Sequence, residues 1–134
     1  MAKRSFKKLA KRLMDEHGTS DPFKIAEREG VQIIYLDFKA WLGLYTCIDG
    51  VKTIFINSNI PRFSQKIVCG HELGHSQQTF KEAVFMKENY LFGVNKLETE
   101  ANEFDATIIF SEEINDEDLT EFDINLLNEL KKYL

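Results

Sequence analysis

The feature that most constrains this chain is the run His71-Glu72-Leu73-Gly74-His75. Phe63 and Ile67 precede His71 at steps of four residues, and this apolar spacing predicts a helix through the run. Histidines at i and i+4 of a helix share one face, with Cβ atoms about 5 to 6 Å apart. Both imidazoles can therefore reach one zinc ion at about 2.0 to 2.1 Å, so we expect one zinc per chain.

Glu72 lies between the two predicted ligands, on the side of the metal where a water molecule would bind. Zinc lowers the pKa of such a water to about 7, and a neighbouring carboxylate can take its proton as it attacks a carbonyl. The same pattern also occurs in helices that bind no metal. Here it uses two of the three histidines, and Gly74 leaves room behind the metal. We therefore interpret Glu72 as the catalytic residue of a hydrolase.

A catalytic zinc site needs a third protein ligand and one open position. The extended pattern with a third histidine is excluded, because Gln78 and Lys81 stand where its glycine and histidine would be. The remaining histidine, His17, lies beside Gly18 at the end of the first predicted helix, where we expect a capping or surface role. The third ligand should therefore be a carboxylate.

Two glutamates are the leading candidates for that carboxylate. An apolar stripe predicts a helix over residues 97–108, and Glu98 and Glu100 flank the stripe on opposite sides. Glu98 shares its face with Asn102 and Asp105, polar groups that could orient a metal ligand. Helix geometry thus favours Glu98 and makes Asn102 the candidate orienting residue, while Glu100 stays open as the alternative ligand.

The remaining patterns predict an α+β fold, with helices packed on a small, mainly antiparallel sheet of about three strands. The pair Asp49-Gly50 is a strong hairpin signal, because a type I′ turn needs positive φ at both central residues. Residues 80–95 are irregular by pattern. Besides the two helices described above, the predicted elements are helices over 3–17, 22–29 and 124–133 and strands over 31–36, 42–48 and 51–57.

Length and composition limit the class of protein. A chain of 134 residues fits one domain, which we expect to span residues 1–134. The net charge of -5 argues against a surface built for nucleic acid. No stretch reaches the roughly 20 apolar residues of a membrane span. The two cysteines are too few for a disulfide framework, which favours a reducing compartment, and we expect a cytoplasmic protein without direct nucleic-acid or membrane partners.

Several segments together resemble the ImmA/IrrE-like metallopeptidases, a family often encoded by phages and mobile elements. The resemblance covers most of the chain, and its clearest part is Glu98-Thr99-Glu100-Ala101-Asn102-Glu103-Phe104, which looks like the family's Glu-x-x-Ala-Asn-x-Phe signature. Two departures are Asp105, where the family usually has alanine, and Ile-Ile-Phe-Ser at 108–111 in place of Leu-Leu-Met-Pro. The other matching segments are a basic first helix, His17-Gly18-Thr19, Thr53-Ile54-Phe55-Ile56-Asn57 and Val68-Cys69-Gly70 before the histidine run.

The resemblance implies a minimal zincin-like domain whose zinc ligands are His71, His75 and Glu98. It also implies a zinc-dependent endopeptidase that cleaves a helix-turn-helix repressor at a specific site, an anti-repressor role. The alternative is a non-catalytic zinc module that sequesters a repressor or toxin partner. The presence of Glu72 argues against that alternative, because a scaffold needs no carboxylate beside an open metal position.

Substrate binding is predicted along a sheet edge, because an exposed strand holds an extended peptide through backbone hydrogen bonds. The strand over 51–57 is the expected edge, with Thr53, Phe55 and Asn57 as candidate contacts. Tyr45 and Tyr90 could stabilise an oxyanion, although packing is the favoured interpretation of both. Packing is also the expected role of Trp41, which could instead line the lip of the cleft, and of Cys69, a small buried hydrophobe.

Overall fold

The computed structural model describes residues 5–78 and 95–134. The arrangement confirms the α+β class and the predicted helices and strands. The irregular segment predicted over 80–95 lies outside the described residues, except for Asn95. The elements follow the chain in the order α1 (Phe6–His17), α2 (Pro22–Arg28), β1 (Gln32–Leu36), β2 (Gly43–Ile48), β3 (Val51–Asn57), α3 (Arg62–Ser76), α5 (Lys96–Ile109), the 3-10 helix η1 (Asp116–Asp118), α6 (Glu121–Leu130) and the 3-10 helix η2 (Lys131–Tyr133).

Local signals set the ends of the first two helices. The Ser5 side chain accepts a hydrogen bond from the backbone of Lys8, and the Asp21 side chain accepts one from Phe23, so each residue caps its helix. Gly18 ends α1 with a φ of 64°, in the left-handed region that glycine enters without steric penalty. The chain therefore turns from α1 into α2 within a few residues.

The sheet has the strand order β1-β3-β2, so β3 lies at its centre. β2 and β3 form the predicted hairpin, and its turn residues Asp49 and Gly50 have φ values of 51° and 78°. β1 pairs with the other side of β3 and runs parallel to it. The sheet is therefore mixed, with one antiparallel and one parallel pair, rather than mainly antiparallel.

The central position of β3 corrects the prediction of where a substrate strand would bind. Both sides of β3 are already paired, Thr53 with Gln32 on β1 and with Thr46 on β2. A further peptide cannot add to a strand whose backbone groups are taken. Thr53, Phe55 and Asn57 are therefore not edge residues, and the edges of this sheet are β1 and β2.

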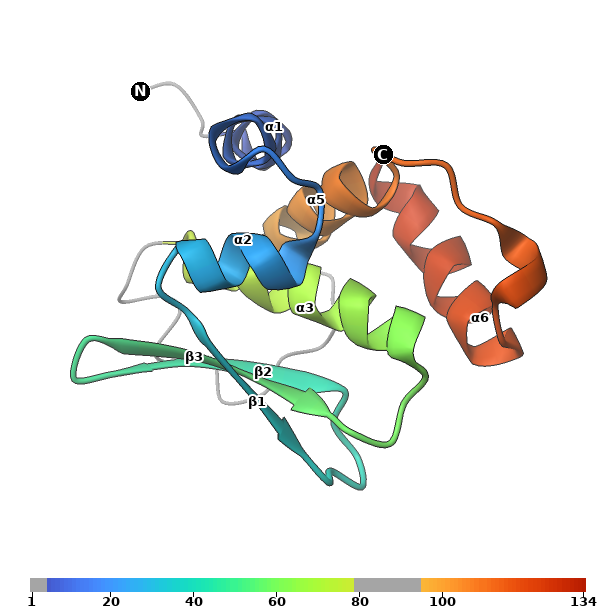
Figure 1. Cartoon of the computed structure of the whole chain (residues 1–134), viewed down its shortest axis with the longest axis horizontal. Coiled ribbons are helices and arrows are strands. Elements are labelled where there is room, and N and C mark those ends of the chain that lie inside the picture. The colour runs from blue at the N-terminus through green and yellow to red at the C-terminus, as the bar shows by residue number, and fades with distance from the viewer. Residues whose placement is uncertain (1–4, 79–94) are drawn as a thin grey trace.

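The helices cover one face of the sheet, with α2 and α3 nearest to it and α1, α5 and α6 beyond them (Figure 1). The main core joins these layers through wholly buried side chains such as Ile54 of β3, Leu73 of α3 and Phe104 of α5. Burying each such side chain stabilises the fold by about 1.5 to 3 kcal/mol. A second cluster ties α3 and α5 to α6 and contains Ile67, Ala106, Ile109, Leu127 and Leu130.

Two glycines of α3 let α5 approach closely. A Cβ atom on Gly74 would lie 3.0 Å from the Cα of Ala101, and one on Gly70 would overlap the carboxylate of Asp105. Small residues at a helix–helix contact let the two backbones approach closely. Side chains that flank the contact on the two helices can then touch each other. The glycines thus set the first turns of α5 beside the histidines of α3.

Of the helices in the described ranges, not one combines the length and the apolar character that crossing a membrane requires.

Candidate metal centre

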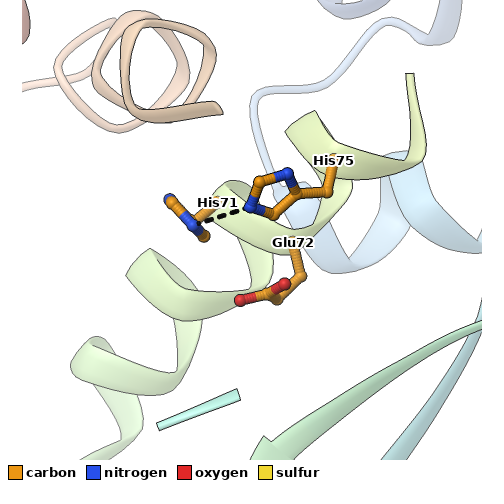
Figure 2. A group of neighbouring side chains, drawn as sticks. All are labelled: His71, Glu72 and His75. Carbon is orange, nitrogen blue, oxygen red and sulfur yellow. Dashed lines mark hydrogen bonds between the residues drawn. The ribbon is translucent and has the colours of Figure 1, made fainter. Parts of the chain in front are cut away.

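Three buried side chains converge where α3 meets the start of α5. The Nε2 atoms of His71 and His75 lie 3.1 Å apart, and their rings meet edge to face (Figure 2). The Oε1 atom of Glu98 lies 2.6 Å from Nε2 of His75, and Oε2 lies 3.5 Å from Nε2 of His71. Ligand atoms about 2.0 to 2.1 Å from a tetrahedral ion are roughly 3.3 Å apart. The three side chains are thus spaced as ligands of one small metal ion would be.

The hydrogen bonds of His75 determine which ring nitrogen carries the proton. Nδ1 of His75 lies 2.7 Å from Oε1 of Gln78, and Nε2 of Gln78 donates to the carbonyl of Leu97 at 2.8 Å. The bond to Leu97 identifies the NH₂ end of the amide, so the oxygen faces His75. Nδ1 of His75 is then the donor, so the neutral form of the ring has its lone pair on Nε2, the atom that faces the site.

His71 is oriented in the same way by a different amide. Its Nδ1 lies 2.8 Å from Oδ1 of Asn102, the candidate orienting residue. With the proton on Nδ1, the lone pair of His71 also points into the site. The two carboxylate oxygens of Glu98 face the Nε2 atoms of both rings, at 2.6 and 3.5 Å. Two imidazole lone pairs and a buried carboxylate therefore face each other, an arrangement that a cation satisfies.

The electrostatics of the site favour positive charge at this point. Burial lowers the pKa of His75, but the carboxylates of Glu98 and Glu72 outweigh burial and raise it above its ordinary value. Burial also raises the pKa of Glu98, but the imidazoles of His71 and His75 outweigh it and bring the pKa to about 2. The residues present therefore fit a divalent metal, in charge as well as in spacing.

Glu72 lies beside this cluster without joining its hydrogen bonds. It extends from α3 toward the sheet, below the two imidazoles in Figure 2. Its carboxylate is buried, and its Oε1 atom accepts no hydrogen bond from the residues that the structure describes. Burial raises its pKa, although His71 and His75 act in the opposite direction. A buried carboxylate with a free oxygen can accept a proton from a water molecule next to the metal position.

The edge strand β2 lies against the Glu72 side chain at Gly43. A Cβ atom on Gly43 would lie 3.5 Å from Cγ of Glu72 and would overlap the side chain of Val68. The backbone of β2 can approach α3 here because residue 43 has no side chain. The sheet edge beside Glu72 is therefore β2.

The other predicted site residues lie apart from the cluster. Glu100, the alternative third ligand, is half-buried and accepts a hydrogen bond from Nε2 of Gln78 at 3.3 Å. His17 lies 2.8 Å from Glu29, between the first two helices, as expected for a structural role. Asn57 donates to the backbone carbonyls of Phe38 and Trp41, so its amide holds the loop before β2.

The expectation of packing is confirmed for Tyr45 and Cys69, whereas Trp41 is exposed. Tyr45 and Cys69 belong to the main core, and burial raises the pKa of both groups. Trp41 is 40% exposed and packs against Phe38, with ring centroids 6.2 Å apart. Tyr90 lies outside the described residues.

Sequence reasoning missed the role of Gln78, which entered only as the residue that stands where the extended pattern has glycine. Its closeness to His75, just beyond the end of α3, was a usable signal. The buried contact between Gly70 and Asp105 was also missed. Neither residue belongs to a recognised metal-binding pattern.

Comparison with known proteins agrees with this geometry. A family model described as the IrrE N-terminal-like domain, Peptidase_M78, matches residues 26–134. A protein of Bacillus phage phi105, named "Uncharacterized immunity region protein 2", is 35% identical over 105 residues, which are 77% of this chain and 66% of the phage protein. The chain thus spans slightly less than two thirds of that relative. No solved structure matches the chain. The family match and the phage relative together show that this chain belongs to the ImmA/IrrE-like metallopeptidases.

Proposed function

We propose that this chain is a zinc-dependent endopeptidase whose ligands are His71, His75 and Glu98. The observation that carries the proposal is the convergence of two imidazole lone pairs and the Glu98 carboxylate on one buried point. A zinc ion at that point would polarise the scissile carbonyl and increase the acidity of a water molecule. The buried ligands and the single base fit a hydrolytic centre with one zinc per chain.

Glu72 is the general base in this proposal. Its free oxygen can take the proton of the attacking water and then give it to the nitrogen of the leaving amine. Figure 2 shows the Glu72 carboxylate below the two imidazoles, and one of its oxygens lies within 4.8 Å of a ring nitrogen of each, close enough to reach a water molecule at the metal position.

The substrate would bind as an extended strand along β2, in place of the edge first expected at β3. Among the strands that the structure describes, β2 is paired on one side only, and its residue Gly43 lies next to Glu72. An added strand would use the free backbone N–H and C=O groups of β2 and would carry its scissile bond past Glu72. This mode of binding requires an unfolded or flexible segment of the substrate.

A helix-turn-helix repressor is the substrate that we propose, and relief of repression is the biological role. The resemblance to the family implies this substrate, and the phage relative is named as an immunity region protein. Cytoplasmic location is part of the proposal, which the free thiols of Cys47 and Cys69 support. The partner is thus a protein, without direct contact to nucleic acid or membrane.

The deciding experiment compares wild type with Glu72→Gln, using as substrate a helix-turn-helix repressor from the same genome. The variant should keep its fold and its zinc while cleavage falls about 10² to 10⁴-fold, the usual contribution of a general base. Fragments are followed by mass spectrometry, with and without a chelator. If wild type binds zinc and the repressor but never cuts it, the chain is a sequestering module instead.

A further inference from the structure

The amide of Asn102 can orient His71 correctly in only one of its two orientations. With Oδ1 toward His71, as observed, Nδ1 of the ring keeps its proton and Nε2 is free to bind a metal. If the amide were reversed, its NH₂ group would face Nδ1 and drive the ring proton to Nε2. The ligand atom would then be blocked, so the orientation of this amide decides whether His71 can bind.

The two orienting amides differ in how they are held. The NH₂ group of Gln78 donates to the carbonyl of Leu97 and to Glu100. Nδ2 of Asn102 is also buried, yet it donates no hydrogen bond to any residue in the described ranges. A buried donor without an acceptor is unfavourable by about 1 to 3 kcal/mol. The observed orientation of Asn102 therefore needs an acceptor nearby.

Asp105 is the matching group. It lies one turn beyond Asn102 on α5, is wholly buried, and has two carboxylate oxygens that receive no hydrogen bond from the described residues. Its carboxylate lies against Gly70, the residue before His71, in space that any larger residue would fill. An unpaired acceptor and an unpaired donor thus lie one helical turn apart on α5, the donor on the amide that contacts the His71 ring and the acceptor against Gly70.

We propose that Asp105 is a positioning residue, which accepts a hydrogen bond from Nδ2 of Asn102 and so fixes the amide that orients His71. A change of side-chain rotamer or one bridging water completes the bond. Burial raises the pKa of Asp105, and the charge of Glu72 adds to this, but a carboxyl group accepts through its carbonyl oxygen in either protonation state. The inference rests on the proposed metal site.

The test compares Asp105→Ala with Asp105→Asn, which keeps an acceptor oxygen, and with Thr107→Ala as a control on the same helix. Zinc affinity is measured by competition with a chromophoric chelator. The tautomer of His71 is read in metal-free protein from imidazole ¹⁵N chemical shifts. Asp105→Ala should weaken zinc binding about 10 to 100-fold, the usual loss when a group behind a metal ligand is removed. It should also move the His71 proton to Nε2, while the other two variants stay close to wild type.

A rescue variant separates positioning from a general loss of structure. In the double variant Asn102→Asp with Asp105→Ala, a carboxylate accepts from Nδ1 of His71 in either orientation. Both readouts should return toward wild type. Asp105→Ala with an unchanged His71 tautomer and zinc affinity would overturn the inference, as would a double variant no better than the single one. The tautomer of His71 is measured without metal, so it tests the role of Asp105 even if the wild-type protein binds no zinc. Absence of zinc binding in wild type would contradict the proposed function but not this inference.

Discussion

The imidazole of His75 and the amide of Gln78 form a link between two helices. Nδ1 of His75 lies 2.7 Å from Oε1 of Gln78, whose Nε2 donates to the carbonyl of Leu97 at 2.8 Å. Gln78 follows α3, and Leu97 lies in the first turn of α5, next to Glu98. One glutamine therefore orients one proposed ligand and holds the turn that carries another.

Replacing Gln78 should weaken the metal site without unfolding the protein. Gln78→Ala removes the acceptor of Nδ1 and the tie to Leu97, so we expect zinc affinity to fall about 10 to 100-fold. Gln77→Ala is the matched control, because the hydrogen bonds that Gln77 donates to Ser76 and Glu29 do not reach the proposed ligands. Chelator competition measures both variants. Equal affinity in the two would show that Gln78 does not support His75.

The choice between Glu98 and Glu100 is open to a direct measurement. Glu98→Ala removes the carboxylate that lies between the two imidazoles and should abolish zinc binding at micromolar metal. Glu100→Ala removes only a half-buried partner of Gln78 and should change affinity a few-fold at most. Elemental analysis of dialysed protein gives the zinc content of each variant. Retained zinc in Glu98→Ala would transfer the ligand role away from Glu98.

Helical spacing could bring the proposed ligands together before the structure was known. Periodicity and motif proposed His71 and His75 and favoured Glu98 over Glu100, and the Asp49-Gly50 pair predicted the hairpin. The sheet edge could not be placed in this way. Strand order depends on the path of the chain between β1 and β3. Strand propensity and the alternation of apolar residues do not indicate that β1 pairs with the side of β3 opposite β2.

The contact between Gly70 and Asp105 could not be predicted from the sequence for a related reason. A glycine within a helix and an aspartate within another are each unremarkable by local pattern. The contact becomes evident only in the packed structure of α3 and α5, where a Cβ atom on Gly70 would overlap the carboxylate of Asp105. Contacts between residues far apart in the chain require the tertiary structure, whereas spacing along one helix does not.

That contact predicts a pair of variants whose effects are not additive. Gly70→Ala should destabilise the metal-free protein by about 1 to 3 kcal/mol, because the new methyl group overlaps the Asp105 carboxylate. In an Asp105→Ala background the overlap is gone, and Gly70→Ala should be neutral or stabilising, since alanine favours the helix by about 1 kcal/mol. Urea unfolding of the four proteins gives the coupling. Additive effects would show that the two residues do not meet.

The last prediction concerns acid stability, far from the proposed metal site. Asp123 completes the capping box of α6 by accepting from the backbone and hydroxyl of Thr120, and it also accepts from the hydroxyl of buried Ser64 on α3. Burial raises the pKa of Asp123, but the hydrogen bonds from Ser64 and Thr120 outweigh burial and lower it below its ordinary value. A carboxylate with a lowered folded pKa stabilises the protein above its unfolded pKa of about 3.9, and this contribution disappears as pH falls through the folded value.

Asp123→Asn should therefore be less stable than wild type at pH 7, by about 1 kcal/mol as for a lost helix cap. The difference in stability should shrink as the pH falls below about 4. The wild-type carboxyl is then protonated, so both side chains are neutral. Urea unfolding with chelator present, at a series of pH values, keeps the metal site out of the comparison. The exposed Asp118→Asn is the control and should match wild type throughout. A gap between wild type and Asp123→Asn that is constant with pH would mean that the charge of Asp123 contributes nothing, and that the hydrogen-bond geometry alone stabilises the start of α6.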